Sequence, residues 1–118
     1  MYISNLFKRS KKAYLIHPKT YKKMIEEKVI VLLDVRTQSE FEHAHIPNAI
    51  LFPISRVEQH IETYFPNKQL TYVIYCRSGI RSHSALLIMK QLGYDVVYDM
   101  GGLIDWPYEI ITKKSKPI

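Results

Sequence analysis

The sequence has only one cysteine, Cys76, among its 118 residues. A single thiol cannot form an internal disulfide, so a disulfide-stapled extracellular scaffold is excluded and a cytoplasmic location is expected. No uninterrupted apolar run exceeds five residues, whereas a helix that crosses a bilayer needs about 20. The basic N-terminus is followed by no apolar stretch of the kind that secretory signals contain. These scarcities predict a globular protein without a transmembrane segment.

Acidic residues are also scarce, with 11 Asp and Glu against 17 Lys and Arg and a net charge of +6. The excess lies at the ends, because residues 1–28 carry +6, residues 29–106 carry −2 and residues 107–118 carry +2. A protein that binds a nucleic-acid backbone should carry basic residues through its folded body. Nucleic acid is therefore not an expected partner. We expect a basic arm at 1–12, one domain at 13–111 and a tail at 112–118.

Apolar runs alternate along the chain with segments of helical periodicity. The runs predict buried strands over 29–35, 49–52, 71–76 and 95–98. The periodic segments predict helices over 18–28, 55–64 and 85–92. Ser55 and Glu58 form the pattern of a capping box at the start of the second helix, and Gly93 is placed to end the third. This order predicts an α/β domain with a mostly parallel sheet of about five strands and helices on both faces.

Cys76 ends the third expected strand, at the edge of a parallel sheet where ligands collect. Arg77, Ser78, Gly79, Ile80, Arg81 and Ser82 follow it and lead into the next helix. The loop amides, the helix N-terminus and two guanidinium groups all favour an anion, and Gly79 permits the positive φ of a tight loop. Such surroundings lower the pKa of a cysteine from about 8.5 to between about 3.5 and 7.5. We expect a reactive thiolate, with an inert buried cysteine as the alternative.

Three separate motifs resemble those of the rhodanese-like sulfurtransferases. Residues 76–81 (CRSGIR) are similar to the six-residue active-site loop of that family. Residues 33–49, with LDVR, EF and HIPNA, resemble its N-terminal signature, and residues 101–106 (GGLIDW) resemble its C-terminal one. The resemblance covers residues 14–110 and implies a single rhodanese-like domain.

The resemblance also implies a reaction. Cys76 would take a sulfane sulfur from an anionic donor such as thiosulfate, hold it as a persulfide and pass it to cyanide or a thiol, including a thiol on a protein. The backbone amides of 77–82 would stabilise the thiolate and the persulfide, and Arg77 and Arg81 would bind the donor. No cofactor is expected. Ala44 and Asn48 stand where the family often has glycine.

Other polar residues have less specific patterns. Asp34 and Arg36 end the first expected strand and are candidates for a second layer around the site, although a structural pair of Arg36 with Glu40 is the stronger expectation. His43 and His45 lack the neighbouring ligands that a metal site needs, so no metal is expected.

Two other functions remain open at this point. Phosphatases and arsenate reductases of related fold bind their substrate in a Cys…Arg loop. Those loops have five residues between the cysteine and the arginine, whereas four residues separate Cys76 from Arg81. Arsenate reduction would also need a second, resolving cysteine. The remaining alternative is a non-catalytic interaction module; such modules generally lack the cysteine that is present here.

Overall fold

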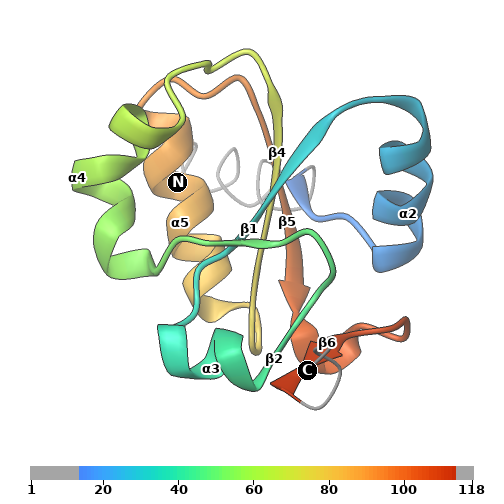
Figure 1. Ribbon diagram of the computed structural model, residues 1–118. Coiled ribbons are helices and arrows are strands. Elements are labelled where there is room, and N and C mark those ends of the chain that lie inside the picture. Colours follow the sequence, from blue (N-terminus) through green and yellow to red (C-terminus); the bar gives the residue numbers. More distant parts are fainter. Residues whose placement is uncertain (1–13, 114–118) are drawn as a thin grey trace, which may run out of the picture.

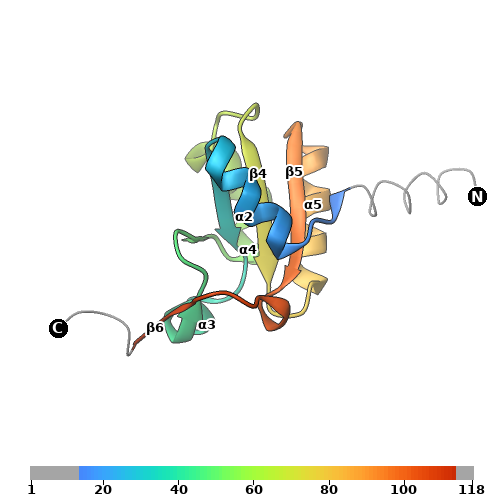
Figure 2. The same cartoon turned by 90° about the vertical axis from the view of Figure 1, so that its right-hand side faces the viewer.

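The computed structural model describes residues 14–113 and has parallel strands at its centre (Figure 1). In spatial order these strands are β3 (Ile50–Leu51), β1 (Ile30–Asp34), β4 (Thr71–Cys76) and β5 (Val96–Gly102). The helices are α2 (Pro18–Glu27), α3 (Gln38–His43), α4 (Ile54–Tyr64) and α5 (Ile80–Gln91). Figures 1 and 2 show α4 and α5 on one face of the sheet and α2 on the other. The expected α/β fold with a mostly parallel sheet is confirmed.

The parallel sheet has four strands in the described part of the chain, where about five were expected. Leu15 pairs with Asp99 beside β5, but only as a single parallel bridge. Two short strands, β2 (Ala44–His45) and β6 (Ile111–Thr112), form a separate antiparallel sheet. The expected boundary between domain and tail falls inside β6, and the expected arm at 1–12 lies outside the described residues.

The central strand β4 is buried along its whole length and serves two cores. Tyr72, Ile74 and Cys76 belong to the core beneath α4 and α5, and Val73 and Tyr75 to the core on the other face. Burial on both faces explains why this strand is a continuous apolar run rather than an alternating one.

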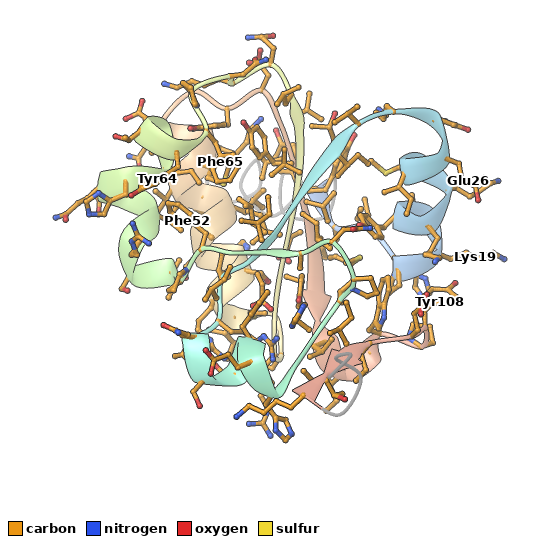
Figure 3. The ribbon with its side chains drawn as sticks, viewed as in Figure 1. Lys19, Glu26, Phe52, Tyr64, Phe65 and Tyr108 are labelled. Carbon is orange, nitrogen blue, oxygen red and sulfur yellow. The ribbon has the colours of Figure 1, made fainter. Side chains whose placement is uncertain are left out.

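Aromatic side chains pack against one another in the core beneath α4 and α5. Phe52 packs edge to face against Tyr64 and Phe65, with ring centroids 5.8 and 5.9 Å away (Figure 3). Phe65 in turn packs against Tyr72 of β4 at 6.1 Å. Such pairs add to the stabilisation that burial of their apolar area provides. The short β3 strand is thereby followed by a firmly packed connection into α4.

The start of α4 differs from the prediction. The helix begins at Ile54, its N-cap is Pro53, and no side chain of the described residues caps it. The predicted capping box of Ser55 and Glu58 is wrong, because Ser55 already lies inside the helix. The N–H of Ile54 instead donates to the carbonyl of Val35 at 3.0 Å. Val35, the residue after β1, therefore satisfies a donor that a capping side chain would otherwise bind.

The start of α2 and the end of α5 agree with the sequence-based prediction. α2 begins at Pro18, whose fixed φ suits the first helical position. α5 is followed by Gly93 at φ +96°, in the left-handed region that a residue terminating a helix commonly adopts. Asn48 also has a positive φ, of +71°.

Candidate active site

Cys76 lies at the carboxyl end of β4 and is 1% exposed. Gly79, the N-cap of α5, has φ +105°, which directs the chain from the strand into the helix. Its N–H donates to Cys76 Sγ at 3.0 Å, and the N–H of Ser82 donates to the same sulfur at 3.3 Å. Two backbone amides at the start of a helix therefore converge on one sulfur atom.

A glycine in β5 allows the loop to lie close behind the sulfur. Gly102 pairs with Cys76 in the sheet register. A Cβ at Gly102 would collide with the carbonyl oxygen of Arg77 and would lie 2.9 Å from Ser78 Cα. The close approach of two backbones thus explains Gly102, whereas Gly101 has open space around it and is explained by its φ of +83°.

Ser82 connects the sulfur to a buried acid. Its Oγ lies 3.6 Å from Cys76 Sγ and 2.7 Å from Asp99 Oδ1. The same carboxylate oxygen accepts the N–H of Gly101 at 2.8 Å. Asp99 is not among the site residues predicted from the sequence, although a lone acid within the apolar run VVYDM is a signal that could have indicated it.

Arg81 is half-buried and is paired with a carboxylate. Its two terminal nitrogens donate to the two oxygens of Glu40 at 2.7 and 3.0 Å. The hydrogen bonds from Arg81 are the main cause that lowers the pKa of Glu40 to about 2, with Thr37 contributing as well. Glu40 also completes a capping box with Thr37 at the start of α3. Arg81 thereby connects the loop to α3, a helix that is not among those predicted from the sequence.

Arg36 and Asp34 form a buried pair. Arg36 Nε donates to Asp34 Oδ1 at 2.9 Å and Nη2 to Oδ2 at 2.6 Å. Nη2 also donates to the carbonyl of Ala44, and the hydroxyl of Tyr75 donates to Asp34. The predicted pair of Arg36 with Glu40 is wrong, because Arg36 precedes α3 and so lacks the helical spacing that would bring the two together.

Two cavities flank the loop. The larger, of about 580 Å³, lies on the α3 side and is lined by Arg36, Ser39, Glu40, His43, Ala44, Arg77, Leu103 and Ile104. Arg77 is exposed there and forms no salt bridge within residues 14–113. The second cavity, of about 460 Å³, lies behind the loop and includes Gly79, Ile80, His83, Asp99 and Asp105 in its lining. Of the two arginines expected to bind a donor, Arg77 lines the larger cavity and has no ion pair with any described residue, whereas Arg81 is paired with Glu40.

Within the described part of the chain, no group of three His, Cys, Asp or Glu side chains could hold a metal ion. No helix described by the structure is long and apolar enough to cross a membrane.

Comparison with known proteins identifies the family. The model of the rhodanese-like domain matches residues 17–108. The chain belongs to the rhodanese-like domain family. Among the relatives of this rhodanese-like chain is the thiosulfate sulfurtransferase PspE of Escherichia coli (strain K12), which is 36% identical over 73 residues, covering 62% of this chain and 70% of that protein. The thiosulfate sulfurtransferase GlpE of Coxiella burnetii is 30% identical over 84 residues, covering 70% and 77%.

Solved structures agree with the assignment to the rhodanese-like family. A structure described as rhodanese with anions from E. coli has a TM-score of 0.66 and 31% identity, covering 71% of this chain and 99% of that one. A rhodanese-like domain protein from Staphylococcus aureus has a TM-score of 0.66 and 32% identity, covering 80% and 92%. The relatives support sulfurtransferase activity at the level of the family.

Proposed function

We propose that this rhodanese-like chain is a sulfurtransferase that carries a sulfane sulfur on Cys76. The observation that carries the proposal is the convergence of the Gly79 and Ser82 amides on Cys76 Sγ, at 3.0 and 3.3 Å. Hydrogen bonds to the charged form of a group favour that form. The N-terminal end of α5 adds a partial positive charge at the same point. The site is therefore suited to a thiolate and to the persulfide anion that would replace it.

The reaction would proceed in two displacements. The Cys76 thiolate attacks the outer sulfur of thiosulfate, a new S–S bond forms, and the S–S bond of thiosulfate breaks as sulfite leaves with the electron pair. Cyanide or a thiolate then attacks the outer sulfur of the persulfide, and Cys76 leaves as a thiolate. No net oxidation occurs, and no second cysteine is required.

The surroundings of the loop support an anionic donor. Arg77 is exposed and lines the larger cavity, where its charge can attract a small anion. Arg81, in contrast, is engaged with Glu40. We infer that Arg77 is the residue that binds the donor and that Arg81 maintains the loop. A lone nucleophilic thiol that must stay reduced also fits a cytoplasmic setting.

Intact mass measurement tests the proposal. The protein incubated with thiosulfate should gain the mass of one sulfur atom, and cyanide should remove it with formation of thiocyanate. Cys76→Ser is the matched control, since it changes little in volume but cannot carry a sulfane sulfur. A wild-type protein that gains no sulfur, or a variant that gains it equally, would contradict the assignment of Cys76.

A further inference from the structure

Asp99 is a buried acid that the two displacements do not use. It is 2% exposed and lies in β5. Its Oδ1 is bound by the hydroxyl of Ser82, which in turn lies against the sulfur of Cys76. A charged group that is linked to a nucleophile through a single hydroxyl influences the ionisation of that nucleophile.

The hydroxyl of Ser82 has one proton and three acceptors around it. Asp99 Oδ1 lies at 2.7 Å, the carbonyl oxygen of Gly79 at 3.2 Å and Cys76 Sγ at 3.6 Å. A short hydrogen bond to a carboxylate is the strongest of the three, so the proton is directed to Asp99. Ser82 Oγ then presents a lone pair to the sulfur. This one contact accepts an S–H donor, and so it opposes the thiolate that the two loop amides favour.

Ionisation of Cys76 therefore changes this arrangement. The S–H bond breaks as its proton passes to water, the hydroxyl of Ser82 turns to the thiolate, and Asp99 loses a donor. Thiolate and carboxylate then compete for the one hydroxyl proton of Ser82, and their titrations are coupled.

We propose that Asp99 is a positioning residue that controls the ionisation of Cys76 through the hydroxyl of Ser82. The ionised carboxylate keeps the resting thiol protonated against the pull of the loop amides. The inference rests on the sulfur carrier proposed above. A thiolate becomes less nucleophilic as the pKa of its thiol falls, and the attacking thiol is most effective when that pKa lies near the working pH.

Among residues 14–113, no charged side chain other than Asp99 is hydrogen-bonded to the hydroxyl of Ser82. Arg81 of α5 is bound to Glu40 of α3, and Arg36 and Asp34 of β1 are bound to each other. The remaining titratable or charged groups beside the loop are Arg77, His83 of α5 and Asp105 of η1 (Leu103–Asp105). Asp105 lines the same cavity as Asp99 but is exposed, and it provides a control for a change of charge near the loop.

The experiment is a double-mutant cycle on the titration of the thiol. Thiolate absorbance and the rate of alkylation by iodoacetamide are followed against pH for wild type, Asp99→Asn, Ser82→Ala and the double variant. The amide oxygen of Asp99→Asn can still accept the Gly101 N–H but holds the hydroxyl of Ser82 less tightly. We expect the midpoint of thiolate formation to fall by about one pH unit, a tenfold change in the ionisation constant. In the Ser82→Ala background, Asp99→Asn should shift the midpoint of thiolate formation little.

Three results would overturn the inference: no shift with Asp99→Asn, an equal shift in both backgrounds, or a comparable shift with Asp105→Asn. If Asp99→Asn does not fold, carbon-13 NMR of the wild-type carboxylates replaces it. The carboxyl chemical shift of Asp99 should then change over the same pH range in which the thiol ionises. This change should disappear once Cys76 is S-methylated, and a pH dependence of the Asp99 shift that methylation leaves unchanged overturns the inference. Both measurements are independent of sulfur uptake, so a protein that shows the coupling but gains no sulfur contradicts the proposed function alone.

Discussion

Replacing Glu40 by glutamine separates the role of the Arg81 ion pair from that of the shape of the side chain. Glu40→Gln keeps the volume and one hydrogen-bond acceptor for Arg81, but removes the charge. The pair is bidentate, with distances of 2.7 and 3.0 Å. A fall in the pKa of Glu40 from 4.5 to about 2 would correspond to roughly 3.4 kcal/mol if it were fully expressed in stability. The side chains of Arg81 and Glu40 are 33% and 27% exposed, so solvent screening reduces our expectation to about 1 kcal/mol.

The sign of the pH dependence follows from the depressed pKa. The ionised Glu40 stabilises the folded state above its unfolded-state pKa of 4.5, and this contribution is lost as the pH falls through that value towards about 2. Urea unfolding at a series of pH values should therefore show wild type more stable than Glu40→Gln by about 1 kcal/mol near neutrality. The difference should shrink as the pH falls below 4.5.

Glu62→Gln serves as the control, because Glu62 forms a single bond to Lys68 and its side chain is 49% exposed. We expect it to lose less stability than Glu40→Gln. A difference between wild type and Glu40→Gln that stays constant with pH would refute the electrostatic reasoning, as would an equal loss in the control.

Three further predictions concern the loop. Arg77→Ala should raise the KM for thiosulfate roughly tenfold to a hundredfold with little change in kcat, whereas Arg81→Ala should mainly lower stability in urea unfolding; the reverse pattern would assign donor binding to Arg81. Gly102→Ala should lower sulfur transfer and the midpoint of thermal unfolding together, because its Cβ would meet the backbone of Arg77, and a variant with wild-type values would show that the loop has room to move. One glycine inserted between Gly79 and Ile80 should reduce thiocyanate formation about tenfold to a hundredfold, since one amide contact to the sulfur would be lost. Full activity in that insertion variant, or hydrolysis of an aryl phosphate by the wild type above the Cys76→Ser control, would show that loop length does not determine the chemistry.

The parts of the fold that depend on local sequence were predictable. β4 spans Thr71–Cys76 as the apolar run indicated, and α2 begins at Pro18. β5 continues to Gly102, beyond the predicted end at residue 98. An acid and two glycines have low strand propensity, but hydrogen bonding to β4 outweighs that preference. Propensity therefore placed the strand correctly and ended it too early.

The arrangement of charges around Cys76 was less predictable. The loop residues were identified from the sequence because they adjoin a strand end and a helix start. The partners of those residues come from distant segments: Glu40 reaches Arg81 across 41 positions, and Asp99 reaches Ser82 across 17. Spacing along the chain indicates neighbours only within a helix or strand, which is why Arg36 was paired with Glu40 rather than with Asp34.

The burial of Cys76 has a consequence for which molecules can react with it. With 1% of its surface exposed, the empty thiol is shielded from bulky thiols and oxidants that cannot enter the loop. A sulfur bound to it would extend about 2 Å beyond Sγ, the length of an S–S bond. An acceptor would therefore meet the transferable sulfur before it could meet the cysteine. On the function proposed above, protein without the extra sulfur would resist mixed-disulfide formation, whereas protein that carries it would offer that sulfur to an acceptor.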